Sequence, residues 1–392
     1  MIRVFVTGDL HVGREYGSGD THPRKKDLAE NRLEVIQTLV DQANNEKCDM
    51  FVITGDLFDN RYIKKLTKKR IGRVVELLSA FQGYVLWLPG NHDFYSTDAN
   101  DNELWEVVQQ NIDKQGSDIR ILNRFEPEEI DLDEGTVIVY PAYCHTDRVE
   151  ENNLGWIKDL NLQKDDVFKI GVAHGAIEGV AIDTEGVHFF MRKDELEAIP
   201  VDAWLIGHAH VMYPRDLTED YKVSGRIYNA GAHVQMDVGN NTDGNCIILE
   251  MEKQPDGEAV IRAKRFVSGN LFFKRLEVRV EQNGSGTELR DSINAAIKGI
   301  ERERTSISLE ISGVATMDEY DKRDQIYEEC LTGFYEQSKI DDKELRELIS
   351  EELIDREFTD QSFPSRLLKE LIQDPKKTQL VYELLTSDDC KA

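Results

Sequence analysis

Residues 2–11 read Ile-Arg-Val-Phe-Val-Thr-Gly-Asp-Leu-His, and this stretch sets a pattern that recurs along the chain. Its first six residues are rich in β-branched and aromatic side chains and predict a strand, after which Gly8, Asp9 and His11 follow directly. Four later apolar runs also end in a short segment of glycine, acidic, amide or histidine residues. These segments are Gly55-Asp56-Leu57-Phe58-Asp59, Gly90-Asn91-His92-Asp93, His174-Gly175 and Gly207-His208-Ala209-His210.

Helical patterns separate the first of these apolar runs. Residues 33–43 and 68–81 have helical spacing of apolar positions, with short strand candidates between and after them. This alternation favours an α/β fold with a parallel or mixed sheet. The strand candidates are residues 2–7, 50–54, 84–88, 136–140, 168–173, 203–206, 226–228, 246–251 and 259–264. The last three crowd together, which favours an antiparallel or mixed stretch that closes a first domain.

The five polar segments carry side chains that bind divalent metal ions, since Asp, Asn and His offer oxygen and nitrogen ligands. Asp9 and His11 stand two residues apart and can point to the same side to bind one ion, and so can His208 and His210. In α/β sheets, sites form beyond the carboxyl ends of the strands, where these segments would converge. Any one segment alone is better explained as a turn with a surface histidine, but the ordered set of five favours a metal centre.

Length, charge and composition limit the possible functions. The 392 residues suggest two or three domains at roughly 150 residues per domain. A net charge of −27 argues against coating nucleic acid through bulk charge, although a local basic groove remains possible. No apolar run reaches the length that spans a bilayer, and the five scattered cysteines suit a reducing compartment, so we expect a cytoplasmic protein. The sequence contains no Walker loop, which argues against ATP hydrolysis by this chain alone.

The composition changes near residue 268, and we expect a second domain to begin there. Residues 271–280, 289–300 and 306–311 predict a strand, a helix and a strand, which form a small α+β unit. From residue 341 onward, apolar stripes at helical spacing predict amphipathic helices. The expected domains are residues 1–267, residues 268–338 and a helical C-terminal segment, residues 339–392.

The ordered set of segments resembles the calcineurin-like metallophosphoesterase superfamily over residues 1 to about 250. The resemblance implies a four-layer α/β/β/α sandwich with two metal ions at its centre. It implies that one ion is held by Asp9, His11 and His210, the other by Asn91, His174 and His208, and that Asp56 bridges both. It places His92 near the scissile phosphate, as an acid to the leaving oxygen or a transition-state contact and not as a ligand.

Within that superfamily the chain is similar to the SbcD-like branch of DNA double-strand-break repair nucleases. The similarity lies in residues 9–14, in the stretch from Arg32 through Asp49 to Asp59, and in the α+β capping domain and C-terminal helices that follow. It implies a manganese-dependent DNA nuclease, an exonuclease or endonuclease or both. It also implies a homodimer whose C-terminal helices bind the coiled coil of an SMC-like ATPase. Asp59 matches the bacterial pattern of this branch and is expected to orient a ligand or cap a helix.

A basic cluster follows the second metal segment, with seven Lys or Arg residues between positions 61 and 73. Such a cluster can contact DNA phosphates, but most charge runs are solvated helix faces, and the sequence leaves both explanations open. The candidate DNA contacts are Lys64, Lys65, Lys68, Lys69 and Arg73.

Three functions compete. The basic cluster and the additional C-terminal domain favour a DNA nuclease. The acidic composition favours a small-substrate phosphodiesterase or nucleotidase. A structural subunit with a residual site is disfavoured, because a decayed site would be expected to lack at least one ligand. His145 and His188 are predicted to be surface or packing residues, and Trp87 is predicted to lie in the core.

Overall fold

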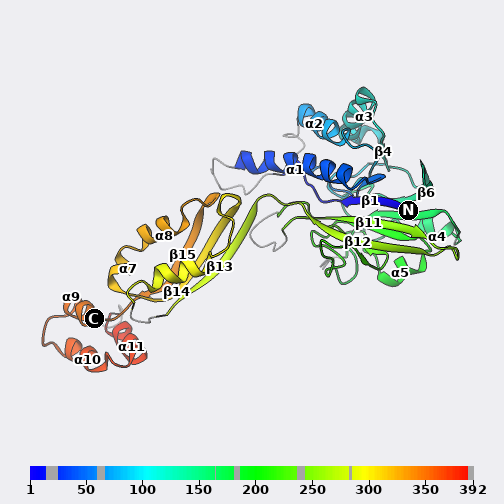
Figure 1. Cartoon of the computed structure of the whole chain (residues 1–392). Coiled ribbons are helices and arrows are strands. Elements are labelled where there is room, and N and C mark those ends of the chain that lie inside the picture. Colours follow the sequence, from blue (N-terminus) through cyan, green and yellow to red (C-terminus); the bar gives the residue numbers. More distant parts are fainter. Residues whose placement is uncertain are drawn as a thin grey trace. The chain divides into compact units, whose positions relative to one another are not determined.

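The computed structural model describes residues 1–14, 25–59, 67–163, 165–180, 186–235, 243–281 and 285–386, without the side chains of residues 25–29, 336–338 and 375–376. The chain divides into two compact units, Met1–Asn270 and Leu271–Ala392 (Figure 1). Each unit is described by itself below.

The first unit contains a seven-stranded sheet in the order β4-β3-β2-β1-β11-β12-β9. Strands β1 to β4 are parallel, whereas β11 is antiparallel to β1 and β12 is antiparallel to β11. The strands are β1 (Ile2–Thr7), β2 (Met50–Ile53), β3 (Tyr84–Trp87), β4 (Ile119–Ile121), β9 (Lys222–Val223), β11 (Asn245–Lys253) and β12 (Ala259–Val267). The antiparallel closing stretch predicted from the sequence is confirmed for β11 and β12. Its first strand candidate, residues 226–228, lies in a second sheet instead, where residues 227–228 pair in parallel with residues 204–205.

A five-stranded sheet of order β10-β8-β7-β6-β5 completes the strands of this unit. Its central strands β6, β7 and β8 are parallel, so their carboxyl ends meet at one edge. The strands are β5 (Glu128–Leu132), β6 (Gly135–Ala142), β7 (Phe168–His174), β8 (Ala203–Gly207) and β10 (Ile227–Tyr228). The helices of the unit are α1 (Lys25–Asn45), α2 (Lys68–Leu78), α3 (Glu103–Gln115), α4 (Gly155–Asp159) and α5 (Lys193–Ala198).

Three hydrophobic cores hold these elements together. Helices α1, α2 and α3 pack on one face of the seven-stranded sheet, where Phe5 and Phe51 stack (Figure 1). Because side chains alternate along a strand, Val4 and Val6 face the other way and pack against the five-stranded sheet. Helices α4 and α5 cover the outer face of that second sheet. The mixed α/β fold predicted from the sequence is confirmed, and Trp87 is fully buried, as expected.

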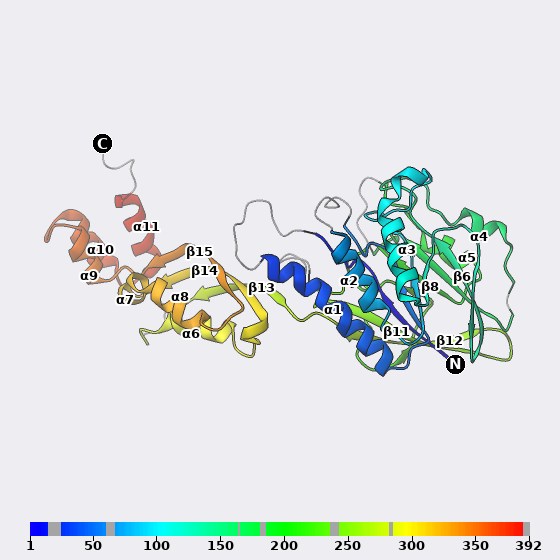
Figure 2. The ribbon, with the colours of Figure 1, turned by 90° about the horizontal axis from the view of Figure 1, so that it is seen from above.

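The second unit is built on a parallel three-stranded sheet, β13-β14-β15, with helices α6 and α8 packed on one side of it (Figure 2). Its elements are β13 (Phe272–Val280), α6 (Glu288–Ala296), β14 (Thr305–Ala315), α7 (Met317–Asp321), α8 (Arg323–Leu331) and β15 (Glu336–Glu347). The sequence predicted helix from residue 341, and this was wrong for residues 341–347. They pair with β14 instead, and Leu345 is buried in the core beneath the sheet.

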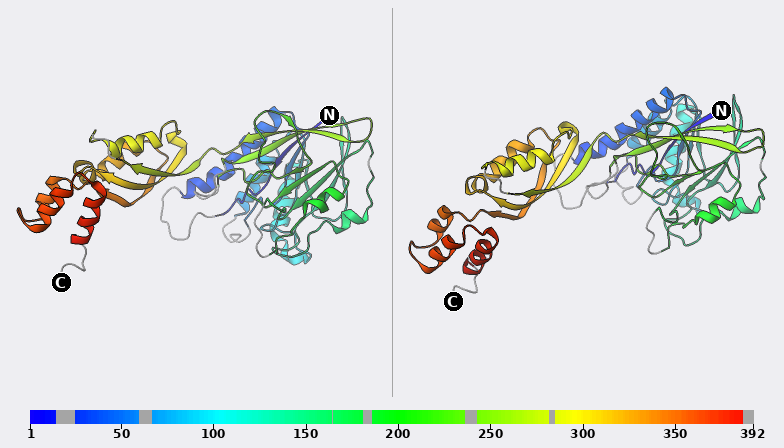
Figure 3. Two further views of the ribbon diagram at one scale, coloured as in Figure 1. Left: turned by 90° about the horizontal axis from the view of Figure 1, so that it is seen from below. Right: turned by 60° about the horizontal axis from the view of Figure 1, so that its bottom comes forward.

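Three short helices end the second unit and form a separate group beyond the sheet (Figure 3). They are α9 (Glu351–Glu357), α10 (Phe363–Leu371) and α11 (Pro375–Thr386). They share a small core of their own around Leu353, Ile354 and Leu368. Among the described helices of the whole chain, none is long and apolar enough to cross a membrane.

Candidate metal centre

The five polar segments converge between the two sheets of the first unit. Three follow β1, β2 and β3, and the other two follow or end β7 and β8. Their His and Asp side chains form three groups in which the ligand atoms lie within 4.8 Å of one another. The groups are Asp9 with His11 and His210, His11 with Asp56 and His92, and Asp56 with His174 and His208. Asn91 joins the third group, because its Oδ1 lies 3.0 Å from His174 Nε2 and 3.1 Å from His208 Nδ1.

An unusual backbone conformation delivers several of these side chains. Asp9, His11 and Asp56 have φ angles of 51°, 46° and 53°, and His208 has a φ of 101°. Non-glycine residues rarely adopt this left-handed region, and each costs of order 1–3 kcal/mol. Backbone hydrogen bonds hold two of these segments against each other: Asp9 N donates to Gly55 O (3.1 Å) and His11 N to Asp56 O (2.9 Å). Strain concentrated in this way is typical of functional sites.

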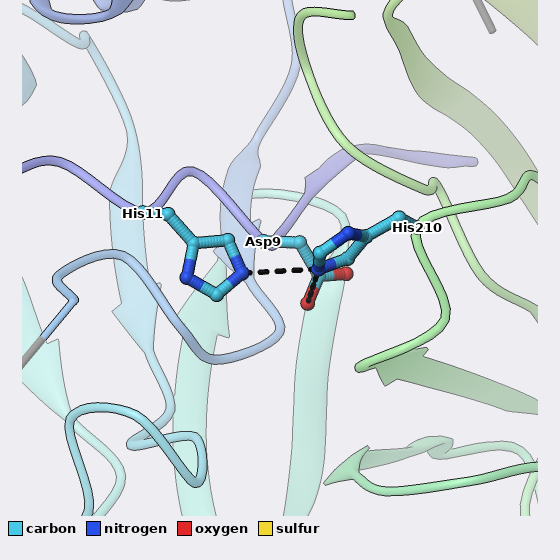
Figure 4. Close-up of side chains that lie close together, drawn as sticks. All are labelled: Asp9, His11 and His210. Atoms are coloured by element: carbon cyan, nitrogen blue, oxygen red, sulfur yellow. Dashed lines mark hydrogen bonds and ion pairs between the residues drawn. The ribbon is translucent and has the colours of Figure 1, made fainter. Parts of the chain in front are cut away.

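The first group brings nitrogen and oxygen ligands to one point (Figure 4). His11 Nε2 faces His210 Nε2 at 3.0 Å, and His210 Nε2 lies 3.9 Å from Asp9 Oδ1. Two imidazole nitrogens and one carboxylate are a donor set that suits first-row divalent metals. The side chains therefore fit one divalent ion at this position.

The Asp56 carboxylate lies between His11 of the first group and His174 of the third group. Its Oδ2 is 3.7 Å from His11 Nε2 and 3.3 Å from His174 Nε2, so one carboxylate faces both groups. The backbone at Gly90 lies very close to the Asp56 carboxylate. A Cβ added to Gly90 would lie 2.3 Å from Asp56 Oδ1 and 2.4 Å from the backbone nitrogen of Asp56. A side chain at position 90 would displace this carboxylate, which explains the glycine that precedes Asn91.

Burial and the pairing of Asp56 with His174 together determine the protonation of the expected ligands. Desolvation lowers the pKa of His208 to about 3 and holds that of His11 well below its usual range. For His174, burial opposes the charged form, but the Asp56 carboxylate outweighs it and raises the pKa to about 9. Burial likewise opposes the Asp56 anion, yet His174 keeps the pKa of Asp56 well below its usual value. His11 and His208 are thus neutral and ready to bind a metal, whereas a metal beside His174 would displace its proton.

His92 is oriented by Asp59. The His92 ring nitrogen Nδ1 lies 3.2 Å from Asp59 Oδ1, and the other oxygen of this buried carboxylate lies 3.7 Å from His11 Nδ1. A carboxylate at Nδ1 fixes the ring and directs Nε2 away from itself. The sequence predicted that Asp59 would orient a ligand or cap a helix; its hydrogen bond here is to His92, which was predicted not to be a ligand.

Asp93 ties two of the segments together. Its Oδ1 accepts hydrogen bonds from the backbone N–H groups of Asp56 (3.2 Å) and Gly90 (2.8 Å), and its Oδ2 accepts one from Phe58 (3.0 Å). The sequence analysis quoted Asp93 within its segment but gave it no role. The three backbone contacts make it a positioning residue for Asp56 and Asn91.

A cavity of about 560 Å³ opens onto the centre. Its wall includes Arg148 and His188, from two loops that pair through a bridge between Val149 and His188. The ring of His188 lies 5.0 Å from that of His208. The prediction of His188 as a surface or packing residue therefore missed its place beside the site. Neither residue stands in a local motif, so no sequence signal marked them.

Three of the five candidate DNA contacts belong to the part of the chain that the structure describes. Lys64 and Lys65 lie outside the described residues. Lys68, Lys69 and Arg73 are exposed on α2, where Arg73 pairs with Glu76 at 2.9 Å, and none of the three is among the described residues that line the cavity.

The family model described as Calcineurin-like phosphoesterase matches residues 2–212, which is more than half of the chain and includes all five segments. The chain belongs to this family. Together with the three Asp and His groups, the match identifies it as a metal-dependent phosphoesterase.

Solved structures of related fold include an archaeal phosphodiesterase, 9% identical with a TM-score of 0.32, whose alignment covers 68% of this chain and 99% of that chain. A dimetal phosphatase from Danio rerio is 11% identical with a TM-score of 0.39, with 68% and 98% covered. A cold-active protein-tyrosine phosphatase from a psychrophilic Shewanella is 13% identical with a TM-score of 0.27, with 67% and 80% covered. Similarities of this size add nothing to the family assignment.

Proposed function

We propose that this chain is a DNA nuclease of the SbcD-like branch, an exonuclease or endonuclease or both, loaded with two divalent ions, Mn²⁺ by preference. The observation that supports phosphodiester chemistry is the full Asp, Asn and His set, joined to a cavity that also holds His92 and Arg148. DNA as the substrate is supported by the exposed cations on α2. The four-layer sandwich, the second unit as a capping domain and a homodimeric assembly belong to the same proposal.

The proposal gives the protein's own residues the following roles. When bound, two ions would activate water and neutralise phosphoryl oxygens. Asp9, His11 and His210 would hold one, Asn91, His174 and His208 the other, and Asp56 both. His92, held by Asp59, would give a proton to the leaving oxygen. Arg148 on the cavity wall would pair with a phosphate oxygen.

A small-substrate phosphodiesterase or nucleotidase is the second candidate, favoured by the net charge of −27. Incubation of the full chain with Mn²⁺ and three substrates separates the two: linear duplex DNA, bis-p-nitrophenyl phosphate and a phosphopeptide. Cleavage of the DNA supports the nuclease. Turnover of the small diester alone supports the second candidate and rejects the first.

Neutralising the α2 cations tests DNA contact. In the triple variant Lys68→Gln, Lys69→Gln and Arg73→Gln, we expect weaker duplex binding with a shallower salt dependence. Each lost phosphate contact reduces the slope of log K against log salt by about 0.9, so three contacts remove up to about 2.7. Turnover of the small diester should stay near normal, because these residues lie outside the cavity lining.

Fluorescence anisotropy of a labelled duplex at several salt concentrations measures that slope. The matched control neutralises Lys47, Lys114 and Arg192, three exposed cations elsewhere on the first unit. Equal slopes for the two triple variants would reject the α2 contact and leave this helix face as ordinary solvated surface.

The C-terminal helices are proposed to bind the coiled coil of an SMC-like ATPase. Phe363 on α10 and Leu380 and Leu384 on α11 are large apolar side chains that remain exposed, which supports an external partner. Removal of residues 349–392 should leave a folded chain with normal turnover of the small diester, since α9 to α11 have a core separate from that of the sheet.

A second truncation, made after Lys339, is compared with the chain that ends at residue 348. It removes most of β15 and the buried Leu345, so this shorter chain should lose the fold of the second unit. Circular dichroism and thermal unfolding of both truncations give the answer. If the chain ending at residue 348 also unfolds, the helices stabilise their own unit and the partner role is wrong.

A further inference from the structure

A row of aromatic rings leads away from the metal cavity. Phe125, in the loop after β4, stacks on Tyr143 with ring centres 4.4 Å apart and an angle of 24° between planes. His145 meets Phe125 edge-on at 6.4 Å and meets Phe189 edge-on at 6.1 Å. Phe189 directly follows His188, which lines the cavity. The rings therefore form a series from Phe189, the neighbour in sequence of a cavity residue, to Phe125.

Two of the loops that carry this row also contribute to the cavity wall, through Arg148 and His188. Cys144 N donates to Pro89 O and Tyr95 N donates to Cys144 O, both at 3.0 Å, so the loop after β6 is fixed against the segment that holds Asn91 and His92. Phe189 N donates to Val149 O at 3.1 Å, which joins the other loop. Phe125 is connected to these loops by its stacking on Tyr143.

Phe125 differs from the rings behind it in its exposure. Tyr143 and Phe189 are buried, whereas Phe125 is 41% exposed. Tyr143 stacks on one face of the Phe125 ring, so the ring is held by a contact while part of the residue remains exposed to solvent. Single exposed apolar side chains are common on protein surfaces, but Phe125 also belongs to a series of contacting rings.

An ordered and partly exposed ring is the kind of platform on which a nucleobase stacks. Base pairs within an intact duplex are already stacked on their neighbours and cannot use it, while an unpaired base can. Two cations accompany the platform: Arg148 lines the cavity and Arg124 precedes Phe125, with Glu126 at 3.1 Å from Arg124. They suit the phosphates on either side of such a base.

We propose that Phe125, supported by Tyr143 and His145, stacks an unpaired nucleobase of a strand whose scissile phosphate lies in the metal cavity. This inference rests on the proposed nuclease function and narrows its substrate to strands with unpaired bases near the cut, such as single strands or frayed ends. The site selects by base stacking, which is tolerant of base identity, so no sequence preference follows from it.

Three variants test the role of the ring. Phe125→Leu keeps an apolar side chain without a ring, Phe125→Trp restores a ring, and Leu160→Ala removes another exposed apolar side chain of the first unit as the matched control. The substrates are a single-stranded oligonucleotide, the same strand with abasic sites around the cut, and bis-p-nitrophenyl phosphate. Base stacking on aromatic side chains predicts a rise in KM for Phe125→Leu of about 5- to 100-fold on the base-bearing strand.

The expected pattern is that this rise is absent on the abasic strand and on the small diester, is absent in Leu160→Ala, and is reversed in Phe125→Trp. A second readout does not depend on turnover: 2-aminopurine placed beside the cut should be quenched on rapid mixing with wild type and much less with Phe125→Leu. Unchanged KM and quenching, or equal changes on base-bearing and abasic strands, would overturn the stacking role. Failure of wild type to cleave either strand while it turns over the diester would instead reject the nuclease function itself, and the platform with it.

Discussion

Asp56→Asn should abolish phosphoesterase activity and remove metal from both positions. The amide keeps the shape of the carboxylate but loses its negative charge, and Asp56 Oδ2 is the atom that faces both His11 and His174. Metal ions supply several kcal/mol of transition-state charge stabilisation, so their loss corresponds to a fall in kcat/KM of about 10³-fold or more.

Calorimetric titration with Mn²⁺ measures the stoichiometry directly, together with turnover of bis-p-nitrophenyl phosphate. Asp216→Asn is the matched control, since Asp216 is an exposed aspartate of the same unit. Thermal unfolding verifies that the variant remains folded. Two equivalents of Mn²⁺ bound by Asp56→Asn with wild-type affinity would contradict the bridging position of this carboxylate.

His92→Ala should slow catalysis while both ions stay bound. The His92 side chain is partly exposed to the cavity and is held at its Nδ1 by Asp59, which suits proton transfer to a leaving oxygen. General acid catalysis contributes about 10²–10⁴-fold, so cleavage of DNA phosphodiesters should fall by that order, mainly in kcat. A p-nitrophenolate leaving group needs little protonation, so the small diester should be partly spared.

Parallel measurement of kcat on an oligonucleotide and on the small diester, with metal stoichiometry, distinguishes the possible roles of His92. The grouping of His92 with His11 and Asp56 makes a ligand role the main competitor. If His92→Ala loses an ion, or if both substrates suffer equally, His92 is a ligand or a structural residue and not the acid.

The sequence was most informative where local pattern and chemistry agree. Glycine, aspartate, asparagine and histidine at the ends of apolar runs predicted both the strands and the convergence of the side chains, because parallel strands bring their carboxyl ends together. These predictions needed no knowledge of how distant segments pack.

Features that depend on distant packing were missed. Residues 341–347 are charged and carry a leucine at helical spacing from the next apolar positions, yet pairing with β14 makes them a strand. Arg148 and His188 come to the cavity through the pairing of two loops about 40 residues apart, which no local pattern records. The row of rings from Phe189 to Phe125 likewise joins three separate segments.

The division of the metal centre between two sheets has a mechanical consequence. Asp9, Asp56 and Asn91 follow strands of the seven-stranded sheet, whereas His174, His208 and His210 end or follow strands of the other. Ions held by both sets would act as cross-links over the open end of the inter-sheet core. Loading would then restrict the sliding and separation of the two layers, and chelation would release them without breaking any hydrophobic contact. The activity of the site and the stability of the two packed sheets would then both increase with the concentration of the divalent ion.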